Sequence, residues 1–217
     1  MAYPPLPHTE RNADKIEALI REHPFAHIFT TGTNGHNVTR LPFMVDSEDG
    51  KIVSLRAHMN AQNPQVTNLD GCDALVAFSG PHSYVSPNWR VDKYRGGTWD
   101  YTSVHVWGTV SVRTDQAFFE KLINDLSSAV EPKFETVLDA PVWSTKDAAE
   151  GYIERLFPLL TAFEIQVTRV QGISKLHQDF ASEDALSAAD YLARSEHPDS
   201  RRVAAQIRAN RSDGSEA

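Results

Sequence analysis

The sequence predicts a mainly β protein with helices at its periphery, in which six or seven antiparallel strands form a small barrel. Two observations favour this fold class. Strand-like segments are joined by tight turns, of which Asn34-Gly35 is a strong two-residue hairpin signal and Asp49-Gly50 is a second. The first 60 residues also lack the regular alternation of strand and helix that a doubly wound α/β fold requires.

The first elements of the chain should form an antiparallel meander behind a helix. Ile16, Leu19 and Ile20 repeat at helical spacing, which predicts a helix over residues 12–23 that ends at Pro24. A proline inside the second of the strands that follow indicates an edge position or a bulge. These strands are expected at residues 25–31, at 37–45 with Pro42 inside, and at 51–57.

The middle of the chain mixes helical and strand patterns. Asn63 suits a helix N-cap and Pro64 the first helical position, so a short helix should begin there. A strand over residues 103–113 places valines on one face and His105 and Trp107 on the other. Also expected are a buried strand at 73–79 and a helix after Thr114 or Asp115 with the apolar stripe Phe119, Leu122, Ile123 and Leu126.

The C-terminal part should contain one more strand and then only helices. Ser182 opens a polar helix, and Pro198 separates it from another. We therefore expect a barrel domain over residues 1–180 and a helical extension with a disordered end over residues 181–217. The expected elements are an irregular segment at 131–144, helical character at 146–156, a strand at 160–170 and a disordered tail after Asn210.

Composition limits the class of protein. The chain has 217 residues, of which 41% are hydrophobic and 23% charged, as in a soluble globular protein. It has no apolar run of the roughly 20 residues that a membrane span needs, and its start has no apolar region typical of a secretory signal. The single cysteine, Cys72, excludes an intrachain disulfide and fits a reducing cytoplasm, where we expect the protein to reside.

The net charge of −8 makes direct DNA binding doubtful. The one candidate basic patch is a group of arginines near the C-terminus, which we interpret as the solvated side of a terminal helix. These arginines are Arg201, Arg202, Arg208 and Arg211.

The stretch Phe78 to Gly108 combines aromatic residues with turn formers between two strand-like runs. It holds three of the four tryptophans, and an aromatic loop beside rigid strands can stack a planar ligand or contact another subunit. The alternative is that Trp89 and Trp99 close the end of the barrel or cover an edge of the core.

The junction at residues 55–65 is a candidate anion site. Arg56 and His58 lie on one face of a strand that runs towards a helix N-terminus, where free N–H groups attract a phosphate. Asn60 and Asn63 would add neutral donors. In the alternative interpretation, Asn63 only caps the helix and Arg56 is a surface charge.

Other chemistry has weaker signals. Lys175 and Gln178 follow the last strand and could hold a phosphate or the N1/O2 edge of a flavin, or could lie in a solvated loop. Asp100 and His105 could form an acid–base or ligand pair only if the fold brings them together. Histidines at metal-ligand spacing and the common nucleotide-binding and hydrolase motifs are absent, so we expect no metal site, and Cys72 should be inert.

Several motifs in order resemble the PaiB-type proteins, FMN-binding split-barrel proteins described as negative transcriptional regulators of protease synthesis and sporulation. The resemblance covers roughly residues 3 to 195. It is carried by Gly80-Pro-His-Ser-Tyr-Val-Ser-Pro-Asn-Trp89, Thr98-Trp-Asp-Tyr101, Val104-His-Val-Trp-Gly108, Leu41-Pro-Phe43, Asn63-Pro-Gln65 after His58, and Lys175-Leu-x-Gln178.

The resemblance implies a split barrel related to pyridoxamine phosphate oxidase and the flavin reductases. It also implies a homodimer with FMN at the subunit interface. The phosphate would lie between Arg56 and Asn63 and the ring along Thr39 to Pro42, with cover from either chain. The implied cofactor-binding residues are Thr39, Arg40, Leu41, Pro42, Arg56, His58, Met59, Asn60, Asn63, Tyr84, Ser86, Trp89, Trp99, Asp100, His105, Lys175 and Gln178.

The chain departs from the family pattern near the same motifs. Asp100 stands where the family has Asn, and Arg90 stands where it has an aromatic residue. The family's Lys-Leu-Ser-Gln-Asn is Lys-Leu-His-Gln-Asp here, which introduces His177 and Asp179. The two aspartates replace amide donors by negative charge.

The sequence leaves three functions open. The first is a dimeric FMN-binding regulator or sensor of the PaiB type. The second is an FMN-dependent oxidoreductase acting on a small molecule, in which the 81–101 loop shapes the substrate pocket and His82, His105 or Lys175 donates a proton. The third is a barrel that keeps the fold without the flavin. Substrate and operator are not encoded in recognisable motifs.

Overall fold

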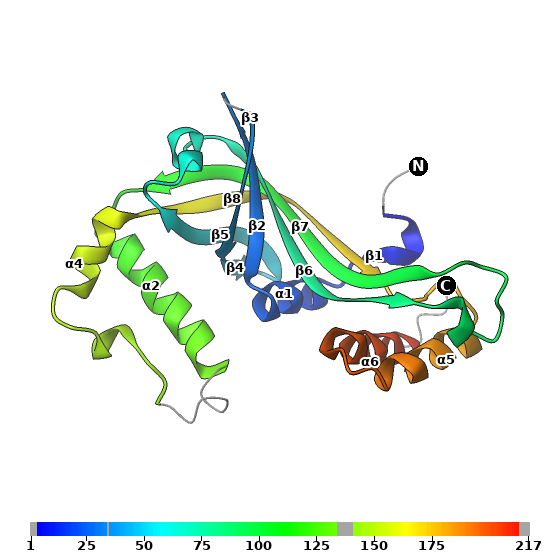
Figure 1. Cartoon of the computed structure of the whole chain (residues 1–217). Coiled ribbons are helices and arrows are strands. Elements are labelled where there is room, and N and C mark those ends of the chain that lie inside the picture. Colours follow the sequence, from blue (N-terminus) through cyan, green and yellow to red (C-terminus); the bar gives the residue numbers. More distant parts are fainter. Residues whose placement is uncertain (1–3, 34, 134–140, 213–217) are drawn as a thin grey trace. The chain divides into compact units, whose positions relative to one another are not determined.

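The computed structural model describes residues 4–33, 35–133 and 141–212 (Figure 1). It is mainly β, as predicted, with eight strands instead of six or seven. The strand order is β3-β2-β6-β7-β8-β5-β4, with β1 paired to β8. The strands are β1 (Thr9–Glu10), β2 (Phe25–Gly32), β3 (Gly35–Pro42), β4 (Met44–Glu48), β5 (Lys51–Asn60), β6 (Asp73–Val85), β7 (Thr98–Arg113) and β8 (Leu160–Lys175).

The strand expected over residues 37–45 is two strands, β3 and β4, separated by Phe43. β3 pairs with β2 at one edge of the sheet and β4 pairs with β5 at the other, so the chain changes edges at this residue. The Phe43 amide leaves the β-ladder and donates to the Pro24 carbonyl at 2.9 Å. The ring packs edge-on against Phe78 and Phe163, at centroid distances of 5.8 and 6.4 Å. Pro42 therefore lies at the end of an edge strand, where the N–H that proline lacks is not needed for pairing.

The aromatic loop expected between two short strands is mostly strand. β6 and β7 extend to Val85 and back from Thr98, so only residues 86–97 connect them. The alternation of buried and exposed side chains continues along β6, where Ser83 and Val85 are buried and Tyr84 is exposed. The turn-forming residues therefore do not mark the strand ends. The strands continue past them because alternate side chains are still buried on one face of the sheet.

The described helices include α1, close to its predicted bounds, and α2, which begins after Asp115. The Asp115 carboxylate accepts a hydrogen bond from the Phe118 amide at 2.9 Å, and α2 buries the predicted apolar stripe. The helices are α1 (Ala13–Glu22), α2 (Gln116–Val130), α4 (Tyr152–Leu156), α5 (Ser182–Ala193) and α6 (Pro198–Ser212). Short 3-10 turns lie at Leu6–His8, Pro64–Asn68, Pro87–Trp89, Glu131–Lys133, Thr145–Asp147 and Phe157–Leu159.

The tail expected to be disordered after Asn210 is helical to Ser212, and its remainder lies outside the described residues, as does part of the irregular segment 131–144. No described helix has the length and apolarity that a membrane crossing requires.

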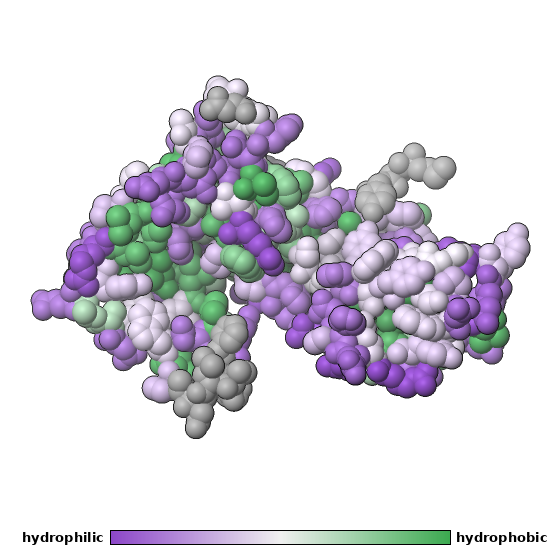
Figure 2. Space-filling view, in the orientation of Figure 1, coloured by the Kyte–Doolittle hydropathy of each residue, from purple (hydrophilic) through white to green (hydrophobic). Residues whose placement is uncertain are grey.

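The chain forms two compact units, each made of several segments. Unit 1 comprises residues 1–19, 79–104 and 171–217, and unit 2 comprises residues 20–78 and 105–170. This division differs from the boundary expected at residue 180, because β6, β7 and β8 each contribute to both units. On the face shown in Figure 2, apolar side chains gather where α2 and α4 meet the sheet, and hydrophilic side chains cover α5 and α6.

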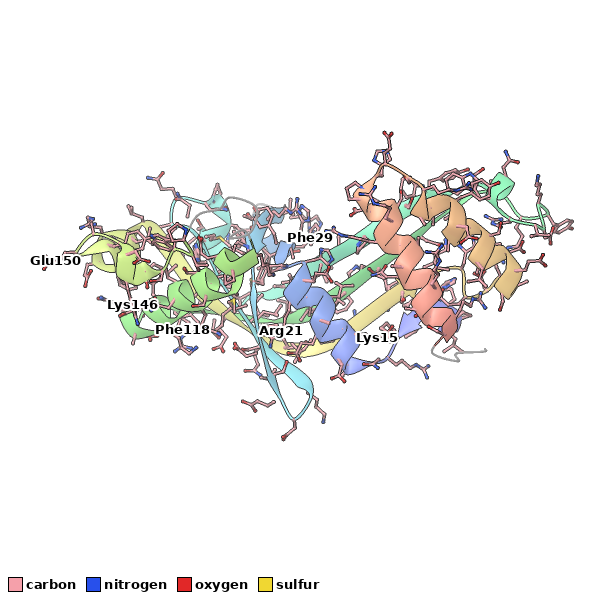
Figure 3. All side chains as sticks on the ribbon, turned by 90° about the horizontal axis from the view of Figure 1, so that it is seen from below. Lys15, Arg21, Phe29, Phe118, Lys146 and Glu150 are labelled. Atoms are coloured by element: carbon pink, nitrogen blue, oxygen red, sulfur yellow. The ribbon has the colours of Figure 1, made fainter. Side chains whose placement is uncertain are left out.

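The core of unit 1 joins α5 and α6 to the strands. The two helices lie side by side in Figure 1 and again in Figure 3, seen from below. Val85 of β6 and Leu176 after β8 are buried in the same cluster as their apolar residues. The helical members of this cluster are Ala185, Ala188, Ala189, Leu192, Val203, Ala204 and Ile207.

Candidate functional site

The predicted corner between β5 and the short helix exists in unit 2. The helix is a 3-10 turn, Pro64–Asn68, and Asn63 caps it as predicted, accepting from the Gln65 amide at 3.0 Å. The Asn63 side-chain amide also donates to the Thr39 hydroxyl at 3.0 Å. Two residues that the resemblance assigns to the cofactor therefore touch each other.

Gln65 completes this corner and was missed as a site residue. It is 3% exposed, accepts from Thr39 Oγ1 at 2.7 Å and donates to Thr30 Oγ1 at 2.9 Å. The network ties β2, β3 and the 3-10 turn together through side chains alone. A glutamine directly after a proline at the first helical position gives no sequence signal of burial, because its partners lie 26 and 35 residues away.

Arg56 is engaged in ion pairs within unit 2. Its Nε and Nη2 donate to both oxygens of Asp46, at 2.6 and 2.8 Å, and its Nη1 donates to Asp125 at 2.8 Å. Its side chain is 9% exposed, so the interpretation as a surface charge is wrong. The guanidinium directs its donors to two carboxylates that the sequence analysis did not identify.

The ion pairs change the titration of all three groups. The hydrogen bond to Asp46 raises the pKa of Arg56 further above its usual value, despite burial. Burial opposes ionisation of Asp46, but the Arg56 hydrogen bond and charge, with Ser54, lower its pKa. The same balance lowers the pKa of Asp125, where Lys121 also donates. All three groups are therefore charged at neutral pH.

His58 and Pro42 meet at a cleft of about 370 Å³ in unit 2. His58 Nδ1 is buried and has no hydrogen-bond partner among the described residues. Burial lowers the pKa of His58, so the imidazole is neutral and can offer one donor and one acceptor. The other lining residues are Ile123, Leu126, Ser127, Val130, Trp143, Tyr152, Leu156 and Leu160.

The remaining predicted residues of unit 2 have structural or surface positions. The Arg40 guanidinium lies 4.6 Å from the Phe25 ring centroid and its Nε donates to the Phe25 carbonyl. Leu41 and Met59 belong to the core. Asn60 is exposed, and its side-chain oxygen accepts from the Gln62 amide at 2.8 Å.

Tyr84, Trp89 and Trp99 come together in unit 1 and line a cleft of about 870 Å³. The rings of Tyr84 and Trp99 meet edge-on at 6.1 Å, and Trp89 stacks on Tyr191 at 5.9 Å. Trp99 is 55% exposed, so it does not close the barrel end by burial. Trp89 is partly buried and packs against the core cluster of unit 1, so it covers an edge of that core. Ser86 accepts from the Asn88 amide and caps the Pro87–Trp89 turn.

The lysine motif after β8 is ordered by local contacts. Lys175 Nζ donates to Thr98 Oγ1 at 2.5 Å. Gln178 accepts from the Leu176 amide at 2.6 Å and donates to the Ser174 carbonyl, so both ends of its amide serve the turn. Lys175 retains further ammonium donors for a ligand.

Asp100 pairs with His177 instead of His105. The Asp100 Oδ2 to His177 Nδ1 distance is 2.5 Å, and both side chains are fully buried. His105 contacts Trp107 edge-on at 5.9 Å. Asp100 and His177 both depart from the family pattern, so two departures that look independent in the sequence form one contact.

Asp179 and Arg90, the other departures, also have partners in unit 1. Asp179 pairs with Arg95 at 2.6 Å, and this partner lowers its pKa although burial opposes the shift. The Arg90 guanidinium donates to the carbonyls of Arg95 and Gly96, both at 2.9 Å, and lies over the Phe180 ring. The negative charge of Asp179 is therefore neutralised within unit 1.

Cys72 fits the expected inert role, since burial and the neighbouring Asp73 raise the pKa of its thiol. In the described ranges, no three histidine, cysteine, aspartate or glutamate side chains gather in a way that could hold a metal ion.

An open antiparallel sheet whose two edges are consecutive in the chain, with peripheral helices, defines a split barrel. The chain belongs to the family described as "Putative FMN-binding domain", whose model matches residues 2–169. This confirms the family expected from the motifs.

Two curated relatives extend over most of the chain. Protease synthase and sporulation protein PAI 2 of Bacillus subtilis (strain 168) is 28% identical over 194 residues, which are 89% of this chain and 90% of that one. An uncharacterized protein of Aspergillus fumigatus is 29% identical over 223 residues, covering 82% and 85% of the two chains.

Solved structures confirm the fold. The FAD and heme binding protein from Mycobacterium smegmatis and the flavocytochrome Anf3 from Azotobacter vinelandii each match with a TM-score of 0.55, at 12% and 14% identity. The matches cover 77% of this chain and 73% and 69% of theirs.

Proposed function

We propose that this protein binds FMN in unit 2 and uses it as a redox or sensory group. The observation that carries the proposal is the family match over residues 2–169, which includes every residue of the corner built by Thr39, Asn63 and Gln65. When bound, FMN would supply hydride or electron transfer at its ring. The protein would bind and orient it.

The isoalloxazine ring fits the cleft beside Pro42 and His58. Its lining is apolar and aromatic, and His58 Nδ1 offers a hydrogen bond that no described protein group satisfies. Because a buried polar atom without a partner costs about 1–3 kcal/mol, a ligand heteroatom that meets it would gain affinity. Neutral His58 can meet either a donor or an acceptor of the flavin.

The phosphate end of FMN would lie at the exposed corner between Asn60 and Asn63. Arg56 supports this corner indirectly, by holding β5 against β4 and α2, since its Nε and both of its Nη atoms already donate to carboxylates. This differs from the role that the resemblance implies for Arg56.

We propose a homodimer with the flavin at the subunit interface. The resemblance assigns contact with the flavin to Lys175, whose ammonium group retains donors beside its bond to Thr98.

A regulatory role is supported by the name of the Bacillus relative, which links that protein to protease synthesis and sporulation. The tail arginines do not favour direct reading of DNA phosphates, because three of the four have close intramolecular partners. Arg201 donates to the Ser195 carbonyl at 2.7 Å and Arg211 to the His177 carbonyl at 2.6 Å, while Arg202 and Arg208 pair with Asp199 and Asp190. We propose a cytoplasmic flavin-dependent regulator or sensor.

The second candidate function is an FMN-dependent oxidoreductase. It is favoured by the open aromatic cleft of unit 1, which is large enough for a small molecule. NAD(P)H consumption that requires added FMN would support it over the regulatory role.

Titration of the purified protein with FMN tests the cofactor proposal. We expect FMN fluorescence to be quenched at micromolar protein, and His58→Ala to weaken binding about 10-fold through one lost hydrogen bond and lost ring contact. His27→Ala, at an exposed histidine of β2, is the matched control and should bind normally. Absence of quenching at about 100 times that concentration, by a protein shown to be folded, would refute FMN binding.

A further inference from the structure

The cleft of unit 1 is separate from the residues proposed to hold FMN in unit 2. It lies between the outer parts of β6 and β7 and the start of α6. Its volume of about 870 Å³ is within the range of small-molecule sites. The lining residues are His82, Ser83, Tyr84, Trp89, Trp99, Ser195, His197, Pro198, Asp199, Ser200 and Arg202.

One wall of the cleft is an aromatic surface held open to solvent. Trp99 and Tyr84 are 55% and 46% exposed, and the His82 ring lies 5.9 Å from that of Trp99. The Tyr84 ring lies across Gly97, where any Cβ would collide with its phenol group. This glycine therefore lets Tyr84 brace Trp99 in an exposed position, although burial of an indole would be more favourable.

The other wall is fixed by contacts on both sides. Trp89 stacks on Tyr191 with the two rings 8° from parallel. The hydroxyls of Ser83 and Ser200, both buried, hydrogen-bond at 2.9 Å and connect β6 to the first turn of α6. The cleft is thus preformed, and a ligand would not have to order it.

The polar groups of the cleft suit an anion. Arg202 is paired only loosely with Asp199, at 3.4 Å, and Asp199 Oδ2 is 3.8 Å from His82 Nδ1. The Arg202 side chain is 57% exposed. Its guanidinium can donate two hydrogen bonds to a phosphate or carboxylate in place of the long contact with Asp199. His82 and His197 add two imidazoles, and Asp199 is the one acidic residue of the lining.

We propose that this cleft binds a second ligand, a planar aromatic molecule that carries an anionic group. Its ring stacks on Trp99 and its anion faces Arg202. A nucleoside monophosphate is a simple member of this class, since it combines a stacking base with a phosphate. The site belongs to unit 1 alone and does not depend on FMN binding in unit 2.

Calorimetric titration of the full chain with AMP, adenosine and ribose 5-phosphate tests the site. We expect AMP to bind at least 10-fold more tightly than adenosine or ribose 5-phosphate, because its base stacks on Trp99 while its phosphate contacts Arg202. Trp99→Ala should weaken AMP binding about 10-fold or more, the effect of one lost stacking contact. Arg202→Gln should weaken AMP binding to a similar extent and leave adenosine binding unchanged.

Two variants outside the cleft serve as matched controls. Trp107→Ala removes a tryptophan of unit 2, and Arg208→Gln removes an arginine of α6 that pairs with Asp190. Both should bind AMP as the unmodified chain does. The proposal is overturned if AMP fails to bind at millimolar concentration, or if these controls weaken binding as much as the cleft variants.

FMN must be included as a competitor, because it is itself an aromatic phosphate. If the second site exists, protein saturated with FMN still binds AMP, and Trp99→Ala leaves the FMN affinity within about 2-fold. If FMN displaces AMP and Trp99→Ala weakens both equally, the cleft is the flavin site and a second ligand is refuted. That result would leave FMN binding itself intact, so the two proposals fail separately.

Discussion

At the scale of single residues, the structure reassigns the most prominent cation of the sequence. Arg56 lies on a strand that leads to the start of a helix, and a phosphate-binding arginine would occupy the same kind of position. Two carboxylates on β4 and α2 neutralise it. Because charges inside a protein need partners, Arg56 connects three elements of unit 2.

Replacing Arg56 by Met should therefore destabilise the protein. We expect the free energy of unfolding to fall by about 2–3 kcal/mol, at the lower end for a broken buried pair because Asp46 and Asp125 are partly exposed. Urea unfolding followed by circular dichroism measures this change. Arg40→Met, at an exposed arginine of β3, should change stability by less than about 0.5 kcal/mol.

The same ion pairs predict acid sensitivity with a defined sign. The pKa values of Asp46 and Asp125 are lowered in the folded protein from the ordinary value of 3.8. Their stabilisation is fully present above that value and is lost as pH falls through the lower folded pKa values. Urea unfolding between about pH 5 and 2 should show a steeper loss for the unmodified chain than for Arg56→Met. Equal slopes would contradict this assignment.

The Asp100–His177 pair predicts strong coupling between two departures from the family pattern. Asp100→Asn and His177→Ser should each cost about 2–3 kcal/mol, because each leaves a buried polar partner unpaired. The double variant, which restores the family's residues, should cost less than the sum by at least about 1 kcal/mol. A double-mutant cycle in urea measures the coupling, and additivity would show that the contact is not formed.

At the scale of elements, the backbones of the long strands β7 and β8 approach each other closely at Gly108. At Gly108 of β7, an added Cβ would collide with the backbone carbonyl of Gln166 and with Ile165 on β8. A neighbouring strand cannot move without breaking its own ladder. β7 and β8 can therefore pair at this register only with a glycine at position 108.

Gly108→Ala should cost about 2–3 kcal/mol of unfolding free energy, in the upper range of overpacking in a tight core. Gly96→Ala is the matched control, because an added Cβ there meets nothing within 4 Å. It should change stability by less than about 0.5 kcal/mol. Thermal and urea unfolding of both variants decide the prediction, and equal effects would refute it.

At the scale of the whole molecule, the C-terminal helices share a hydrophobic core with residues of the strands. Val85 and Leu176 are 0% and 3% exposed, and they share their cluster with residues of α5 and α6. Arg211 at the end of α6 also donates to the carbonyls of His177 and Phe180. We therefore expect the core of unit 1 to be complete only when α6 is in place.

Truncation after residue 180 tests this. We expect the shortened chain to bind a hydrophobic dye and to aggregate, because it exposes the apolar surface that α5 and α6 cover. Size-exclusion chromatography and cooperative thermal unfolding provide the measurement. A soluble, cooperatively folding fragment would instead establish the domain boundary expected from the sequence.

The sequence by itself determined the fold class, the family and most element positions. Periodicity placed the buried stripe of α2, and local chemistry placed the caps at Asn63 and Asp115, because these signals involve residues within a few positions of each other. The motifs also identified the residues that gather at the unit 1 cleft, although not that β6 and β7 extend to carry them.

Only the tertiary structure decided which charged and polar groups meet. Arg56 and Asp125 are 69 residues apart, and Asp100 and His177 are 77 apart. Periodicity shows which face a side chain takes but not which distant segment lies opposite that face. The sequence also did not show that the chain changes sheet edges at Phe43, because that change depends on which distant strands β3 and β4 pair with.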